Sequence, residues 1–259
     1  HGFVSIKPYK DGFFSTWLDG RNTSSSKEQS GHASGPMSLR SAIINSEGEI
    51  IEESEIDNMV CDCCQTSLTV SDNIPIVVYR DRTKNEIRDI SVSRFINSSW
   101  TNSYSLNDDN WKINGCPVNG PYVDSKGKNV AVAWFSAADG NPQVSVKFSN
   151  NQGKSFGEKI LINDLNTIPL GRVDLDFIDQ RSVVVSWLST NKGVGSINLR
   201  KIDMNGNMGE IVSLSNVSSS RATGFPQLER LKNHIFLSWT DEMNGIKKIK
   251  TFQLPISSL

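Results

Sequence analysis

The sequence predicts an all-β fold built from repeats of a four-stranded antiparallel unit. Long apolar patterns with helical spacing are missing, whereas short alternating and β-branched runs recur between clusters of Asn, Asp, Gly and Ser. An apolar run that ends in an aromatic residue and a polar turn recurs along the whole chain, at intervals of about 50 to 60 residues. That spacing is typical of the four-stranded blades of a β-propeller.

The recurring run is expected to be the second strand of each blade. In the third repeat a short strand at 120–124 leads through a polar turn to the run 129–139, and further strands follow at 143–149 and 159–164. The aromatic residues that end the runs are expected to pack between blades; they are Trp17, Tyr79, Trp134, Trp187 and Trp239. The expected blades of this single domain are 1–58, 59–114, 115–168, 169–221 and 222–259.

The fifth repeat ends after its third strand, at 247–254. Propellers commonly complete the last blade with a strand from the other end of the chain, and no sequence before His1 is present to do so. We therefore expect upstream sequence, including a sixth blade, and the alternative is a ring of five blades with an imperfect seam.

Composition excludes several classes of function. The chain has 259 residues, 37% of them hydrophobic, and a formal charge of −1 with acids and bases interspersed, so no basic stripe indicates nucleic-acid binding. No apolar run approaches the roughly 18 residues that a transmembrane helix needs. Four cysteines suit an oxidising compartment, so we expect a secreted or periplasmic protein, although no signal peptide is present in this sequence.

The third repeat also carries a recognisable turn motif. The segment 149–156 resembles the Asp-box of sialidases, Ser-x-Asp-x-Gly-x-Thr-Trp, at Ser149, Asn151, Gly153, Ser155 and Phe156. In such a hairpin turn a short polar side chain accepts hydrogen bonds from backbone amides of the turn. The glycine adopts the positive φ that the turn requires, and the aromatic ring packs under the sheet. The segments 61–70, 79–92, 115–121 and 131–156 are similar to a bacterial group of sialidase-like (BNR-repeat) propellers that carries a CxCC cluster.

That resemblance implies a β-propeller that binds or hydrolyses a carbohydrate, and exo-glycosidase activity is one form that this function takes. Sialidases of the family use three arginines, a Tyr–Glu nucleophile pair and an acidic Asp, and this set is not identifiable here. The resemblance therefore leaves enzymatic activity open. It favours a glycoside hydrolase over a protein without enzymatic activity.

The repeat also predicts which residues line the axis of the ring. Counting back about 15 to 18 residues from each aromatic residue reaches the expected start of the innermost strand. These positions are His1, Cys63, Cys116, Arg172 and Gly224, and we expect them to converge on one mouth of the central channel. The turns after the aromatic strands open on the same face and carry further acidic and basic side chains, with His32 among them.

One hypothesis makes this mouth a site for a carbohydrate or another small anionic ligand. Arg21, Arg82, Arg88 and Arg172 would bind it through charge-assisted hydrogen bonds. Asp81, Glu86 and Asp19 are the candidates for the acid and the nucleophile of a two-carboxylate mechanism. The alternative is that these side chains form surface ion pairs and turn caps.

The four cysteines support a second hypothesis, a non-enzymatic metal-binding or interaction propeller. Cys61, Cys63, Cys64 and Cys116, together with His1, would bind copper or zinc, because thiolates and imidazole suit these ions. Two disulfides that staple the second and third blades are a further alternative, because adjacent inner strands bring α-carbons within reach of a bridge. Free or mixed thiols remain a third one.

Overall fold

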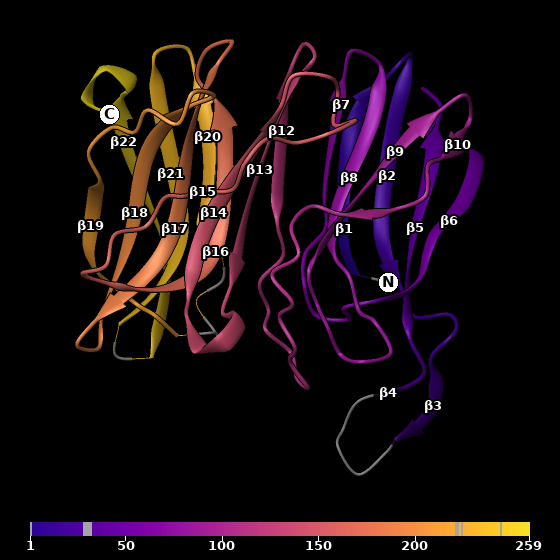
Figure 1. Cartoon of the computed structure of the whole chain (residues 1–259), viewed down its shortest axis with the longest axis horizontal. Helices are drawn as coiled ribbons and strands as arrows, with labels where there is room; N and C mark the ends of the chain where they lie inside the picture. The colour runs from indigo at the N-terminus through magenta and orange to yellow at the C-terminus, as the bar shows by residue number, and fades with distance from the viewer. Residues whose placement is uncertain (1, 28–32, 221–222, 224, 244) are drawn as a thin grey trace. The chain divides into compact units, whose positions relative to one another are not determined.

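A computed structural model describes residues 2–27, 33–220, 223, 225–243 and 245–259 of the chain. Its strands form five principal antiparallel sheets and one short hairpin, β3–β4, which confirms the all-β prediction of blade-like sheets (Figure 1). Among the described residues, no helix has the length and apolar character needed to cross a bilayer. The chain divides into two units, His1–Pro121 and Tyr122–Leu259, which are described separately below.

The first unit contains two of the principal sheets. The first has the order β1-β2-β5-β6, and the second has the order β10-β9-β8-β7, with β11 also paired to β9. The strands are β1 (Gly2–Tyr9), β2 (Gly12–Asp19), β3 (Ser24–Lys27), β4 (Ala33–Ser34), β5 (Met37–Ile44), β6 (Ile50–Val60), β7 (Ser67–Ser71), β8 (Ile74–Arg80), β9 (Ile90–Ile96), β10 (Ser99–Trp100) and β11 (Tyr104–Ser105).

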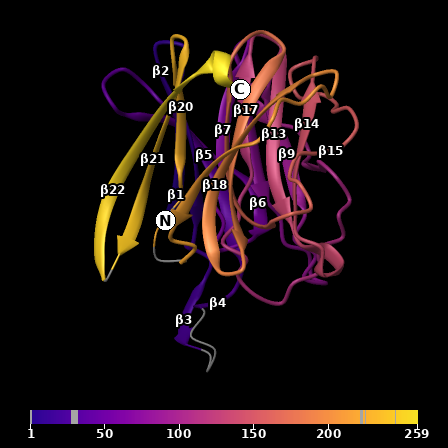
Figure 2. The ribbon, with the colours of Figure 1, turned by 90° about the vertical axis from the view of Figure 1, so that its left-hand side faces the viewer.

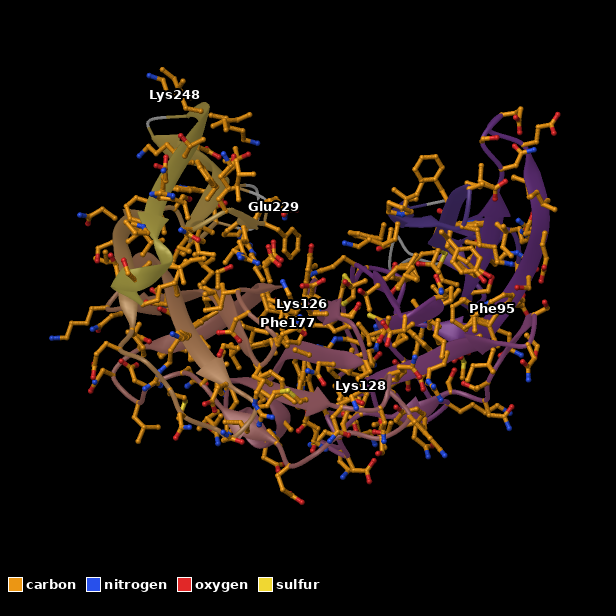
Figure 3. The ribbon with its side chains drawn as sticks, turned by 90° about the horizontal axis from the view of Figure 1, so that it is seen from above. Phe95, Lys126, Lys128, Phe177, Glu229 and Lys248 are labelled. Carbon is orange, nitrogen blue, oxygen red and sulfur yellow. A yellow bond between two sulfur atoms is a disulfide. The ribbon has the colours of Figure 1, made fainter. Side chains whose placement is uncertain are left out.

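An aromatic cluster packs the two sheets of the first unit together. Phe14 of β2 contacts Phe95 of β9 and Trp100 of β10 edge-to-face, with ring centroids 5.1 and 5.6 Å apart. Figure 3 labels Phe95 within this unit. The Trp100 indole N–H donates a hydrogen bond to Ser41 Oγ at 2.8 Å, so its polar atom is satisfied inside the cluster.

The second unit contains the other three principal sheets. Their orders are β12-β13-β14-β15, β16-β17-β18-β19 and β20-β21-β22, and Figure 2 shows the last three strands side by side. The strands are β12 (Tyr122–Lys126), β13 (Asn129–Ser136), β14 (Gln143–Ser149), β15 (Ile160–Leu161), β16 (Ile168–Phe177), β17 (Ser182–Asn191), β18 (Val194–Asp203), β19 (Val212–Val217), β20 (Gln227–Leu231), β21 (His234–Met243) and β22 (Ile246–Pro255).

The second strands of the first two sheets in this unit, β13 and β17, are buried on both faces. In β13 every residue after Asn129 is buried, and in β17 the first eight residues are buried. Strands that are covered on both sides read as continuous apolar runs instead of alternating ones, which is why the recurring motif stands out in the sequence. Trp134 and Trp187 are among the largest fully buried side chains, as expected for residues that pack between sheets.

Carboxylates connect the innermost strands of the second unit. Asp124 of β12 accepts a hydrogen bond from the Phe177 amide of β16 at 3.0 Å. Asp174 Oδ2 of β16 accepts one from the Leu228 amide of β20 at 2.8 Å. Asp176 Oδ2 accepts a parallel bond from the Arg230 amide at 2.7 Å. Each inner strand is therefore held to the next by side-chain acceptors rather than by a β-ladder.

Figure 3 labels Phe177 beside Lys126, the last residue of β12, and strands β12 and β16 are in contact.

Burial raises the pKa of Asp174 to about 8 and that of Asp176 to about 7. Both carboxyl groups therefore change their protonation state near neutral pH. They are also the acceptors of the hydrogen bonds that join β16 to β20.

The turn at 149–156 has a closed set of hydrogen bonds. Ser149 Oγ accepts the amides of Asn151 and Gly153 at 3.2 and 3.0 Å, and Asn151 Oδ1 accepts the Ser155 amide at 3.0 Å. The Asn151 amide group also donates to Ser155 Oγ at 2.9 Å. Gly153 has φ of 69°, in the left-handed region that favours glycine. Asn151 thus provides the acceptor that an aspartate would provide, whereas membership of the Asp-box family stays a prediction.

Replacing Ser149 by alanine is expected to destabilise the second unit by about 1–2 kcal/mol, because two turn amides lose their acceptor. Chemical denaturation followed by fluorescence measures this difference. Asn150→Ala is the matched control, since Asn150 is exposed in the same turn. An equal loss in both variants would mean that the Ser149 hydrogen bonds do not stabilise the turn.

Candidate functional site

The four cysteines come together in the first unit. Cys61 follows the end of β6, Cys63 and Cys64 lie in the loop before β7, and Cys116 lies in the loop after β11. Cys63 and Cys116 form a disulfide with their α-carbons 5.9 Å apart, whereas Cys61 and Cys64 are free and buried. The structure therefore has one disulfide where the disulfide alternative predicted two, and a site that uses all four thiolates is incompatible with this oxidised form.

The two free thiols lie against each other and beside the disulfide. Cys61 Sγ is 3.3 Å from Cys64 Sγ and 3.8 Å from Cys63 Sγ, and Cys63 Sγ is 4.0 Å from Cys64 Sγ. The side chains of Cys61 and Cys64 are nearly excluded from solvent, with exposed fractions of 1% and 2%. Among the described residues, these three cysteines form a group whose sulfurs are close enough to ligate one metal ion.

A buried cation sits on one of these sulfurs. Arg88 Nη1 lies 3.3 Å from Cys61 Sγ, and the Arg88 side chain is 4% exposed. The hydrogen bond between Cys61 and Cys64, followed by the contact with Arg88, lowers the pKa of Cys61 to about 6. Burial raises the pKa of Cys64 well above the usual value of a thiol. The pair is therefore a thiolate beside a neutral thiol at neutral pH.

A second buried arginine holds the cysteine loops in place. Arg80, the last residue of β8, donates from Nε to the Asn119 carbonyl at 2.7 Å and from Nη1 to the Arg88 carbonyl. Its guanidinium stacks over the Trp111 ring at 4.7 Å from the centroid. Burial lowers the pKa of Arg80. Sequence reasoning missed this residue; the available signal was a charged side chain at the end of an apolar run.

The loop that carries Cys116 also reaches the first cysteine loop through its backbone. The Asn119 amide donates to Cys64 Sγ at 3.4 Å, and the Gly120 amide donates to Gln65 Oε1 at 3.0 Å. Gly120 approaches so closely that an added Cβ would lie 2.0 Å from the Gln65 carbonyl oxygen. Only glycine fits at this contact, so the segment 115–121 is shaped to pack on the cysteine loop.

The turn after β8 gathers the acidic and basic residues predicted for ligand binding. Glu86 lies between two arginines: Arg82 Nη2 contacts Oε1 at 2.7 Å, and Arg88 Nη2 contacts Oε2 at 2.8 Å. Asp81 instead accepts a hydrogen bond from Ser91 Oγ at 3.1 Å and one from the Arg82 amide at 2.7 Å.

The surroundings of Asp81 and Glu86 shift the pKa values of these two acids in opposite directions. Burial, followed by the charge of Asp57, raises the pKa of Asp81. The hydrogen bond from Arg82, followed by that from Arg88, lowers the pKa of Glu86. Asp57 also accepts a hydrogen bond from the Tyr79 hydroxyl at 2.7 Å, but Tyr79 is fully buried, so this pair is closed to a substrate.

The corresponding turn after β2 forms an ion pair. Arg21 Nη2 contacts Asp19 Oδ2 at 2.8 Å and Glu53 at 2.9 Å, and the Trp17 indole donates to the same Asp19 oxygen at 2.9 Å. The hydrogen bond from Arg21 holds the pKa of Asp19 well below its usual range. Asp19 is fully buried. Its part in catalysis stays a prediction.

The remaining predicted site residues are either outside the described residues or in the second unit. His1, His32 and Gly224 are outside the described residues. Arg172 belongs to the second unit, where it donates to the Ser220 carbonyl at 3.0 Å and lies over the Phe225 ring. The expected convergence of these positions on one mouth of a ring stays a prediction.

A cavity of about 490 Å³ lies in the second unit, between the hairpin at 148–160 and the turn at 204–206. Its lining residues include Phe156, Glu158 and Asn205. Sequence reasoning placed no site here, because the turn motif was assigned a structural role.

Comparison with known proteins gives a likeness of fold. No protein-family model matches the chain, and no curated protein sequence does. A structure of a phage phi92 endosialidase is 12% identical over 98% of this chain and 51% of that one, with a TM-score of 0.53. At this identity the likeness shows the fold alone, and the chain spans about half the length of that endosialidase.

Two further structures are more distant in shape. An endo-arabinase from Bacteroides thetaiotaomicron is 10% identical, with 98% of this chain and 93% of that one covered and a TM-score of 0.49. A prolyl endopeptidase is 12% identical, with 97% and 35% covered and a TM-score of 0.46.

Proposed function

We propose that the protein binds and hydrolyses a carbohydrate at the turn 81–88, with Asp81 and Glu86 as the two carboxyl groups. The observation that carries this proposal is that their pKa values move apart: that of Asp81 rises and that of Glu86 falls. Two acids whose surroundings separate them in this way are suited to the roles of proton donor and ionised partner.

The chemistry follows from these protonation states. Protonated Asp81 would donate its proton to the glycosidic oxygen as the bond to the leaving group breaks. Ionised Glu86 would attack the sugar carbon directly or take a proton from an attacking water molecule. If Glu86 attacks the sugar, water then hydrolyses the glycosyl–Glu86 ester while the Asp81 carboxylate takes up a proton of that water, so both residues return to their starting states. If Glu86 activates water instead, Glu86 ends protonated and Asp81 ends as a carboxylate. In both routes the leaving group ends as an alcohol.

Arg82 favours an anionic sugar. Its side chain is 28% exposed and presents its guanidinium beside Glu86, and a guanidinium binds a carboxylate through two parallel hydrogen bonds. The fold shared with an endosialidase supports the same class of substrate. We therefore propose a sugar that carries a carboxylate, such as a sialoside.

Asp81→Asn and Glu86→Gln are expected to lower kcat for a fluorogenic sialoside or another glycoside by about 100-fold or more, because each removes a proton-transferring or charged group. Glu158→Gln in the second unit is the matched control and should leave kcat unchanged. The pH profile should lose its upper limb in Asp81→Asn, since the pKa of Asp81 is the raised one.

Binding is measured separately on an array of acidic and neutral glycans. Hydrolysis that survives both substitutions would contradict the assigned residues. Absence of both turnover and glycan binding by the full-length protein would contradict the proposed function itself.

We also propose that the protein acts outside the cytoplasm. The disulfide between Cys63 and Cys116 supports an oxidising compartment. Fractionation of the source cells tests this, with recovery in the cytoplasmic fraction as the contrary result.

A further inference from the structure

The sulfurs of Cys61, Cys63 and Cys64 are arranged as the ligands of one ion would be. Their separations are 3.3, 3.8 and 4.0 Å. Three sulfurs that each lie about 2.3 Å from one metal ion in a trigonal plane are about 4.0 Å apart. The three atoms therefore need to move by only a few tenths of an ångström to surround an ion.

The charges around the sulfurs favour an anionic complex. Cu(I) bound by two or three thiolates carries a net negative charge, and Arg88 Nη1 already contacts Cys61 Sγ at 3.3 Å. The buried Arg80 guanidinium interacts electrostatically with the sulfurs of Cys64 and Cys61 as well. Two cations in a dry site stabilise an anionic complex and oppose a neutral or positive one.

The ligand set also separates copper from zinc. Thiolates are soft ligands that select Cu(I), which two or three sulfurs satisfy. Structural zinc takes four ligands in a tetrahedron. In the part of the chain that the structure describes, the group of ligand atoms within 4.8 Å of one another contains these three cysteines, and neither the Cys116 sulfur nor an imidazole or carboxylate is a fourth member.

We propose that Cys61, Cys63 and Cys64 bind one Cu(I) ion when the Cys63–Cys116 disulfide is reduced. A dithiol supplies the two electrons and two protons: it becomes a disulfide, and Cys63 and Cys116 become thiols. Cu(I) then displaces a proton from each thiol that ligates it. In the oxidised chain only Cys61 and Cys64 remain as ligands, so the disulfide regulates the affinity for copper.

This inference is independent of the proposed action on carbohydrates, because it uses the cysteines and not the carboxylates. The full chain is titrated anaerobically with Cu(I) in competition with a coloured Cu(I) chelator, before and after reduction with dithiothreitol and its removal. The reduced chain is expected to bind one Cu(I) ion at least ~100-fold more tightly than the oxidised chain, since even the loss of a residue that only supports a metal ligand costs 10–100-fold.

Cysteine-to-serine variants separate the roles of the four residues. Cys116→Ser is the matched control: it leaves all three proposed ligands in place and should bind Cu(I) tightly without prior disulfide reduction. Cys61→Ser, Cys63→Ser and Cys64→Ser should each lose at least ~100-fold in affinity. Circular dichroism checks that every variant is folded.

X-ray absorption of the copper-loaded, reduced chain should show sulfur-only ligation with three sulfurs at about 2.3 Å. The proposal is overturned if the reduced chain binds Cu(I) no more tightly than its Cys63→Ser variant. It is equally overturned if Zn(II) binds more tightly than Cu(I), or if Cys116→Ser binds as weakly as the oxidised chain.

Discussion

Replacement of Arg80 by alanine is expected to cost the first unit about 3–5 kcal/mol of its free energy of unfolding, which is large for a single substitution. Arg80 is 2% exposed, and its guanidinium donates hydrogen bonds to the carbonyls of Asn119 and Arg88 and stacks on Trp111. Its loss leaves two buried carbonyls without this donor and a void under the aromatic ring. Urea denaturation monitored by fluorescence measures the change.

The cysteines report whether the damage is local to the site. The loop held by Arg80 carries Cys116 and donates its Asn119 amide to Cys64, so Cys61 and Cys64 should react faster with a thiol reagent in the variant. Arg80→Lys keeps the charge but loses the planar guanidinium with its several donors. Its thiol reactivity should therefore lie between that of wild type and that of Arg80→Ala. Lys84→Ala, on an exposed turn, should stay within about 0.5 kcal/mol of wild type. Unchanged thiol reactivity in Arg80→Ala would show that the arginine does not hold the loops.

The second unit is expected to become less stable as pH rises through the neutral range. Burial raises the pKa of Asp174 to about 8, against about 3.9 in an unfolded chain. Between these values the folded state binds more protons than the unfolded state, so the free energy of unfolding falls as pH increases. The stabilising contribution is complete below about pH 4 and is lost by about pH 8; Asp176, with a pKa of about 7, acts in the same direction.

We expect Asp174 to cost the unit on the order of 4 kcal/mol between about pH 5 and pH 8, because a pKa of about 8 lies roughly three units above pH 5 and one unit corresponds to about 1.4 kcal/mol. Asp174→Asn should flatten this dependence and cost stability at pH 5, because one of the amides of Leu175 and Leu228 loses its acceptor. Thermal melts across the pH range measure both curves. Asp164→Asn, in the loop before β16, is the control. A wild-type protein that is more stable at pH 9, with a slope that Asp174→Asn removes, would show that the ionised carboxylate is the favoured acceptor.

The carboxylate turn 81–88 and the thiol cluster share one residue of the candidate site. Arg88 contacts both Glu86 and Cys61, so it belongs to the carboxylate turn and to the thiol cluster at once. An ion bound at the sulfurs would change the charge next to Arg88 and, through it, the protonation of Glu86. Measuring glycoside hydrolysis with and without Cu(I) would reveal such coupling.

The sequence by itself determined the strand repeat, the all-β class and the gathering of cysteines from two segments. Strand patterns are local, because buried second strands are apolar throughout and turns carry Gly, Asn and Asp, so they are legible without any neighbour. The tertiary structure alone decided which cysteine pairs with Cys116, the position of Arg80 under the loops, and the opposed pKa shifts of Asp81 and Glu86. These depend on burial and on contacts between residues tens of positions apart, and neither quantity is written in the pattern of a single strand.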